Sequence, residues 1–365
     1  MTERDYNIDL LRVLSTVFVL VLHVLGEGGV LRSAASGSAV YWTAWLLEIL
    51  VYCAVNCFAL ISGYIMVNKT IRLKSIAALW LHALFYSLLI TALFLAFVPE
   101  TRSLWNVIVA FFPVTGKQWW YISAYFMLLF FIPLLNQVAS SITQATYKKF
   151  LIVILIVVCL IDRVIPVDSF ALSSGYSPAW LILVYLLGAY LRKYRPHERI
   201  TAAQGALGFF AMILLTFLSK LFIYYTTKSI FGHVKYEDTF ISYTSITIVM
   251  AAIFLFALCM NVKVGTFAKK IIGFFAPMTL GVYLIHVQPL VFGYVIQDAF
   301  APLAQQHPAV MVGCVLAWAL TIFLLCSGID LMRIRLFKLA RVDRVCQMAE
   351  NKIMGLYRKV FKESL

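Results

Sequence analysis

The chain has 365 residues, of which 63% are hydrophobic and only 13% are charged. Soluble domains average about 45–50% apolar and about 25% charged residues, so this composition excludes a soluble globular protein and predicts a polytopic membrane protein. The formal net charge of +14 would suggest nucleic acid as the partner of a soluble protein. In a membrane protein the enrichment of Lys and Arg in inner loops explains it first, so we expect contact with membrane lipid and not with nucleic acid.

Ten segments are long and apolar enough to cross a bilayer, which takes about 20 residues each. They predict an all-α bundle of about ten transmembrane helices within a domain at 1–332. The predicted spans are 8–26, 43–66, 75–97, 118–138, 149–166, 178–193, 202–225, 239–260, 271–297 and 309–332. With the N-terminus inside, the inner loops and the tail hold 22 of the 30 Lys and Arg residues, and the outer loops hold six. This bias predicts that both termini are cytoplasmic.

The first span carries two ionisable residues, Arg12 and His23, and we expect it to be an uncleaved anchor. An ionisable residue costs roughly 2.5–3.5 kcal/mol at the centre of a membrane helix, so it usually has a function or a partner. Eleven residues at about 100° and about 1.5 Å each return to nearly the same face, roughly 16 Å away. The pair suits a long anionic ligand that enters from the cytoplasm and delivers its reactive end to a base.

For each ionisable residue of these spans, a structural role is the alternative to a chemical one. A neutral imidazole takes up a proton near physiological pH, so His23 is a candidate general base, although it could instead be a packing residue. Arg12 could bind phosphate or a polarised carbonyl, or it could pair with Asp9 three residues earlier. Glu48 lies near the outer end of the second span, at a depth similar to that of His23, so it could orient the imidazole or face water.

The loop after the second span is basic, with Lys69, Arg72 and Lys74 close together. The positive-inside bias alone predicts such a loop, but it would also suit the phosphates of a nucleotide-bearing donor. The chain has no GxGxxG or P-loop pattern to compete with that idea. Ser62 lacks the GxSxG setting of a nucleophile, and close helix packing explains its motif better.

Aromatic residues open the fourth span, at Trp119-Trp120-Tyr121. Interfacial belts place Trp and Tyr there by default, and such faces also stack on sugar rings, so these residues are candidate acceptor-binding residues. Tyr283 and His286 in the ninth span are further candidate substrate-binding residues, and the buried position of His286 favours a polar pathway there. The other histidines, His82, His197, His233 and His307, are expected to be loop or packing residues.

The tail at 333–365 alternates basic and apolar residues at helical spacing. It is predicted to lie along the inner leaflet, and a direct role in binding ligand phosphates is the alternative. Of the seven cysteines, six fall in apolar segments, which predicts no disulfide framework. Cys53 and Cys57 are one helical turn apart without an accompanying histidine, so we expect packing and no metal.

These motifs together resemble the acyltransferase-3 family of membrane acyltransferases. The matching residues are Asp9-Leu10-Leu11-Arg12 with ten residues before His23, Phe58 with Ile61-Ser62-Gly63-Tyr64, Trp120-Tyr121-Ile122 with Pro133, and Tyr283-Leu284-Ile285-His286. They extend from the first span to the ninth, so the resemblance covers nearly the whole chain.

The resemblance implies a ten-helix domain that passes an acyl group, usually acetyl, from cytoplasmic acyl-CoA to a hydroxyl of a surface glycan or lipid-linked sugar. His23 would be the catalytic histidine, and Arg12 would support the donor or its thioester. Many members carry a further esterase-like domain after an eleventh helix, whereas this chain continues into its basic tail and would be a stand-alone form. The family's arginine-rich motif after the second span is reduced here to Lys69, Arg72 and Lys74.

We therefore expect an acetyl-CoA-dependent O-acyltransferase of a bacterial cytoplasmic membrane. His23 would deprotonate the acceptor hydroxyl for direct attack, and a covalent acyl-histidine intermediate is the competing mechanism. A transporter or flippase for a glycan or an anionic metabolite is the rival class, because polar residues in spans also form substrate pathways, but no inverted repeat is evident. A membrane sensor domain is a third alternative.

Overall fold

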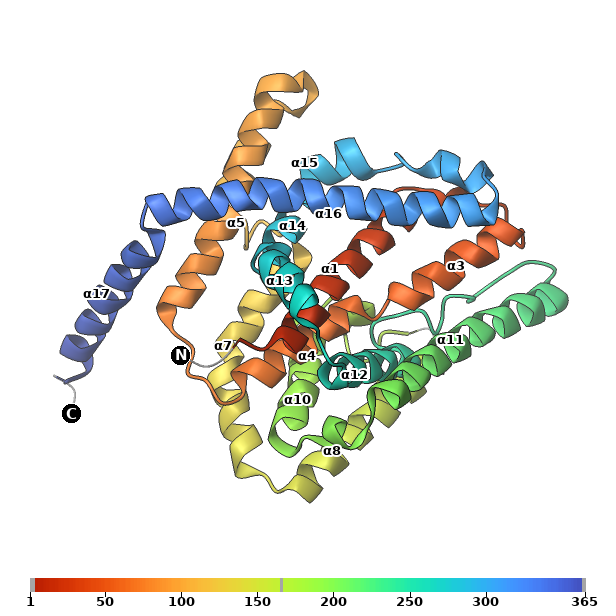
Figure 1. Cartoon of the computed structure of the whole chain (residues 1–365), viewed down its shortest axis with the longest axis horizontal. Helices are drawn as coiled ribbons and strands as arrows, with labels where there is room; N and C mark the ends of the chain where they lie inside the picture. The colour runs from red at the N-terminus through yellow and green to blue at the C-terminus, as the bar shows by residue number, and fades with distance from the viewer. Residues whose placement is uncertain (1–3, 165–166, 363–365) are drawn as a thin grey trace.

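The computed structural model describes residues 4–164 and 167–362, and within these ranges every regular element is a helix. The helices form one bundle (Figure 1). They are α1 (Tyr6–Leu25), α2 (Val30–Ser33), α3 (Ala39–Val51), α4 (Ala54–Met66), α5 (Leu73–Phe97), α6 (Leu104–Phe111), α7 (Trp120–Ser141), α8 (Gln144–Ile156), α9 (Asp162–Val164), α10 (Pro178–Tyr194), α11 (Ala202–Phe231), α12 (Ile246–Asn261), α13 (Thr266–Phe275), α14 (Thr279–His286), α15 (Pro289–Val291), α16 (Pro308–Leu339) and α17 (Val342–Lys362).

Eight helical stretches of the described chain are long and apolar enough to cross a membrane. They are Tyr6–Ser33, Ala39–Met66, Leu73–Phe97, Trp120–Ser141, Gln144–Val164, Ala202–Phe231, Thr266–His286 and Pro308–Leu339. The other two predicted spans contain the shorter helices α10 and α12, of 17 and 16 residues. The all-α, multi-pass class is confirmed, while residues 1–3, 165–166 and 363–365 of the predicted segments lie outside the described residues.

The ninth span was predicted at 271–297, and this extent is wrong. The helical stretch begins earlier, at Thr266, tightens to a 3₁₀ turn at Ala276–Met278, and ends at His286. Gln288 has extended backbone geometry (φ −59°, ψ 131°), as expected for a residue that precedes a proline. Its side chain caps the next short helix by accepting from Leu290 N–H at 2.7 Å. The break brings the end of α14 and its histidine into the interior.

Helices α4 and α10 are in backbone contact at two glycines. A Cβ added at Gly63 would lie 2.0 Å from the carbonyl oxygen of Tyr185, and one added at Gly188 would lie 2.2 Å from that of Leu60. Small residues at a helix crossing allow this approach, so Gly63 packs closely as predicted for this motif. Ser62 itself lines the cavity and donates to the carbonyl oxygen of Phe58 at 2.9 Å. The crossing fixes the position of α4, which forms one wall of the cavity described below.

The apolar core consists of two large clusters, and α1 runs between them. Leu11 of α1 belongs to the cluster built around α4, α10 and α12. Leu20 of the same helix belongs to the cluster built around α5, α14 and α16. The polar residues of α1 therefore lie where the two clusters meet.

Candidate active site

A cavity of about 590 Å³ lies between α1, α4, α5, α7 and α14. Lys69 and Arg72 of the α4–α5 loop, together with Arg12, line one part of it, which we call the loop end. His23 and His286 line another part, which we call the histidine end. Arg12 and His23 thus share one cavity, as the spacing on α1 predicts, and its volume falls within the range of about 300–1,000 Å³ that is usual for small-molecule sites.

The two histidines form a hydrogen-bonded pair. His23 Nδ1 lies 3.0 Å from His286 Nε2, and His286 Nδ1 lies 2.6 Å from the carbonyl oxygen of Val282. Because a carbonyl only accepts, His286 Nδ1 carries the proton, so Nε2 of the neutral ring accepts from His23 Nδ1–H. Nε2 of His23 then has a free lone pair. It makes no hydrogen bond to the described residues and is not enclosed by them.

Local structure holds this pair in place. His286 is the last residue of α14 and is 1% exposed. Phe292, which follows the Gln288 cap, packs edge-on against the His23 ring, with a centroid distance of 5.2 Å. The imidazole of His23 is therefore held through one hydrogen bond and one aromatic contact, and its free nitrogen keeps a defined direction.

Arg12 makes the predicted pair with Asp9 and also lines the cavity. Its Nη1 donates to Asp9 Oδ1 at 3.0 Å, and Asp9 also accepts from Arg4 Nε at 2.6 Å. The Arg12 side chain remains 36% exposed and lines the cavity. Its other N–H donors make no hydrogen bond within the described chain, so the guanidinium can still bind an anion.

The structure separates the other predicted site residues. Trp120, Tyr121 and Tyr283 line the cavity. Trp119 does not, because it is fully buried and its Nε1–H donates to the carbonyl oxygen of Leu284 at 3.2 Å. Lys74 likewise lies off the cavity, with Nζ 3.9 Å from Asp343.

Glu48 lies away from His23. It is 7% exposed, does not line the cavity, and has no hydrogen bond to His23 in the described structure. The group that orients the imidazole in this structure is His286, so a similar depth in the membrane did not mean contact.

Several polar and aromatic lining residues were missed from the sequence, among them two tyrosines. Tyr176 and Tyr243 line the cavity beside Trp120, with ring centroids 4.6 Å apart for Trp120 and Tyr176 and 5.1 Å for the two tyrosines. Both lie in loops before a helix, where no periodic pattern indicates which way a side chain points. They extend the aromatic wall that Trp120 begins.

Comparison with known proteins adds the family. A family model described as an acyltransferase domain matches residues 5–328. The chain belongs to the acyltransferase-3 family. No curated protein and no solved structure matches it. The resemblance seen in the motifs is confirmed, and the matched range includes every residue that lines the cavity.

In this family member, a buried carboxylate supports the helix that carries His286. Asp330 of α16 is fully buried and accepts hydrogen bonds from Tyr86 Oη at 2.7 Å and Arg333 Nε at 2.9 Å. His82 Nε2 lies 3.2 Å from the same carboxylate. His82 is therefore a packing residue, as predicted, and its packing contact is polar. A Cβ at Gly281 of α14 would lie 2.1 Å from Asp330. Asp330 therefore ties α5 and α16 together directly beneath α14.

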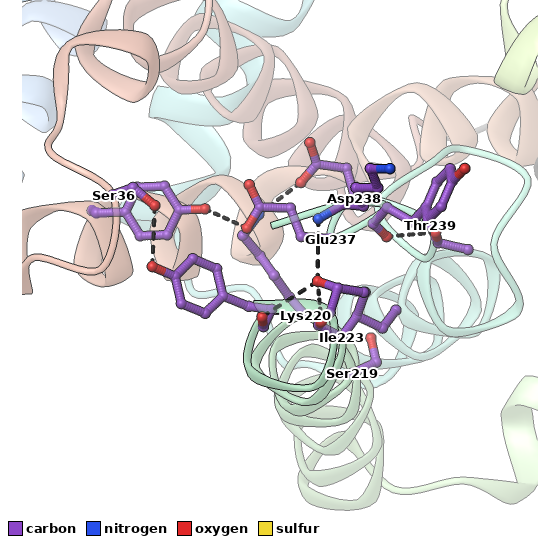
Figure 2. Close-up of polar contacts among 12 residues, drawn as sticks. Ser36, Ser219, Lys220, Ile223, Glu237, Asp238 and Thr239 are labelled. Carbon is purple, nitrogen blue, oxygen red and sulfur yellow. Dashed lines mark hydrogen bonds and ion pairs between the residues drawn. The ribbon is translucent and has the colours of Figure 1, made fainter. Parts of the chain in front are cut away.

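A second polar cluster joins α11 to the loop that precedes α12. Figure 2 shows Lys220 of α11 reaching toward Glu237 and Asp238. Its fully buried ammonium lies 2.7 Å from Asp238 Oδ1, 3.3 Å from Glu237 Oε2, and 3.6 Å from the ring centre of Trp45. Tyr41 Oη donates to Glu237 at 2.5 Å. These contacts fasten the loop that leads to Tyr243.

Replacing Lys220 with Met should lower the stability of the protein. The methionine retains contact with Trp45 but leaves Glu237 and Asp238 without their cation. Removing one partner of a buried pair costs about 3–5 kcal/mol, and we expect about 1–3 kcal/mol here because the Asp238 side chain is 55% exposed. Thermal unfolding in detergent measures the change. Lys228→Met, on the same helix, is the control, and equal midpoints for the two variants would contradict the prediction.

Proposed function

We propose that this acyltransferase-3 protein is an O-acyltransferase. It moves an acyl group, acetyl in the first instance, from acyl-CoA to a hydroxyl of a surface glycan or lipid-linked sugar. The observation that carries the proposal is that one cavity contains both the cations of the loop end and the free Nε2 of His23. Such a cavity can hold an anionic donor at one end and a base beside its reactive group at the other.

The proposed orientation places the loop end at the cytoplasmic side. The charge bias of the loops supports it, and so does the position of the start of α1 and of α17 on the same side of the bundle (Figure 1). With α10 and α12 also crossing, the chain would span a bacterial cytoplasmic membrane ten times. Acyl-CoA would then enter beside Arg12, and the acceptor would meet the acyl group at His23.

The reaction needs a base that later acts as an acid. His23 Nε2 takes the proton of the acceptor hydroxyl as its oxygen bonds to the thioester carbon. The carbon–sulfur bond then breaks, and the same proton passes from Nε2 to the thiolate of CoA. His286 holds the tautomer of His23 that leaves Nε2 free, so its proposed part is to position the base.

Tyr283 is placed to bind the reacting carbonyl. Its hydroxyl is buried without a hydrogen-bond partner in the described structure, and its side chain lines the cavity next to the histidine pair. A buried hydroxyl without a partner is costly, so a ligand oxygen that accepts from it would remove that cost. We propose that it donates to the thioester oxygen, where negative charge develops during attack.

Tyr283→Phe should lower kcat by about 10²-fold, because one donor to the developing oxyanion is lost. It should leave the thermal midpoint unchanged or slightly raised, since no protein hydrogen bond is broken. Steady-state kinetics and thermal unfolding of the same sample give both values. Tyr225→Phe, at an exposed position on α11, is the control. A lower midpoint with unchanged kcat would assign Tyr283 a purely structural role.

The decisive experiment supplies acyl-CoA from the cytoplasmic side. Inside-out membrane vesicles that contain the protein receive acetyl-CoA labelled in the acetyl group, and the glycan and lipid-linked sugar fractions are then counted. Label in these fractions that requires the protein supports the proposal. Transport of sugar or metabolite without consumption of acetyl-CoA would refute it in favour of a transporter.

A further inference from the structure

The last helix places a carboxylate on the arginine of the loop end. Arg72 Nη2 donates to Glu350 Oε2 at 3.2 Å and to Gln347 Oε1 at 2.8 Å. The backbone N–H of Lys74 donates to Glu350 Oε1 at 3.4 Å. Both oxygens of one carboxylate from α17 are therefore engaged at the start of α5. Figure 1 shows the two helices side by side there.

These donors form an anion site. Arg72 is the N-cap of the 25-residue helix α5, and Lys74 lies in its first turn. The N–H groups there have no partner within the helix, and they lie at its positive end. The carboxylate of Glu350 is the anion that occupies the site. Burial acts to raise the pKa of Glu350, but the hydrogen bonds from Lys74 and Arg72 outweigh it and hold the pKa below its ordinary value.

Arg72 also lines the cavity, whereas no described residue of α17 does. An anionic ligand that enters at the loop end meets Arg72 with its Nη2 already donating to Glu350 and Gln347. The negative charge of Glu350 offsets the charge of Arg72 and would repel a second anion beside it, so Glu350 and an incoming phosphate compete for this arginine.

The packing of α17 against the rest of the bundle is consistent with a helix that can dissociate from α5. In its described part the only fully buried hydrophobic side chain is Cys346, while Val345 and Met348 are exposed. The turn between α16 and α17 contains Arg341 with φ +51°, a left-handed conformation that non-glycine residues disfavour. Because only one of its described hydrophobic side chains is fully buried and the turn before it is unfavourable, release of α17 from α5 should be easier than release of a helix with a buried apolar face.

We propose that α17 is an autoinhibitory element in which Glu350 occupies the anion site that the phosphates of the acyl donor require. Donor binding then displaces Glu350 from Arg72. This inference rests on the proposed function, because it takes the donor to be a phosphate-bearing acyl-CoA. It adds regulation to that site, since any condition that draws α17 away would raise the affinity for the donor.

The test measures equilibrium binding of CoA to the purified full-length protein. Glu350→Gln, which keeps the size of the side chain, should bind CoA about three- to tenfold more tightly than the unmodified protein. Asp343→Asn is the matched control. It removes one carboxylate from the same helix, but Asp343 lies 3.9 Å from Lys74 Nζ and has no hydrogen bond to Arg72. Its affinity should stay within about twofold, so that a general charge effect is excluded.

A second pair of variants isolates Arg72. In an Arg72→Gln background, adding Glu350→Gln should change the affinity little, because the competition needs the guanidinium. The inference is overturned if Glu350→Gln binds CoA equally or more weakly, which would mean that Glu350 positions Arg72 for the donor. If no variant binds CoA, the donor assignment of the proposed function fails as well, so the two failures are distinguishable.

Discussion

Replacement of His23 with alanine is expected to reduce acyl transfer by about 10²- to 10⁴-fold, the usual contribution of a positioned general base. The variant loses the free Nε2, and water in the enlarged cavity cannot hold the acceptor hydroxyl in the same geometry. The measurement is transfer of labelled acetyl by protein of verified folding and insertion. His233→Ala, at an exposed loop position, is the control and should retain full activity.

Two further variants separate the base from its support. His23→Gln retains an N–H that can reach His286 but has no basic nitrogen, so it should be as inactive as the alanine variant. His286→Ala leaves the base present but unoriented, and it should lose less activity. Wild-type transfer by a well-folded His23→Ala protein would remove the histidine from the mechanism.

Gly63→Ala is expected to destabilise the bundle by about 3 kcal/mol or more, at the upper end of the usual cost of overpacking. The added Cβ would lie 2.0 Å from a backbone oxygen of α10, and no rotamer change can relieve a contact with backbone. Helices α4 and α10 would have to separate, and α4 is a wall of the cavity. Thermal unfolding and the yield of monodisperse protein in detergent report the loss.

The matched control is Gly313→Ala on α16, where a Cβ would meet no atom within 4 Å. Alanine there should leave the midpoint unchanged or raise it, since glycine costs about 0.5–1 kcal/mol in a helix relative to alanine. Gly188→Ala tests the same crossing from the other side. Equal midpoints for Gly63→Ala and Gly313→Ala would show that the two helices do not pack in this way.

Hydropathy alone located the helical segments, because ten apolar runs separated by polar loops leave little freedom in where helices form. The ends were less predictable. The ninth segment remains apolar beyond His286, and only the backbone restriction before Pro289 ends the helix there. The prediction that Arg12 and His23 share a face needed only the period of one helix, and both line the cavity.

Residues on different elements were harder to place. Depth along the membrane normal is readable from sequence, but rotation about a helix axis relative to distant helices is not. Glu48 and His23 therefore have similar predicted depths and different surroundings, and Trp119 faces away from the cavity that its neighbour Trp120 lines. The pairing of His23 with His286 joins residues 263 apart in the chain, which no local pattern encodes.

The bond from His286 Nδ1 to the carbonyl of Val282 closes one end of the histidine pair. A carbonyl oxygen accepts a hydrogen bond but passes no proton onward. The histidine pair therefore does not conduct protons through His286 to bulk water. If the proposed reaction is right, the proton that leaves the acceptor is returned within the same cavity. The enzyme would then move an acyl group outward without carrying charge from one aqueous phase to the other. Its driving force would be the free energy of the thioester, independent of the electrochemical gradient.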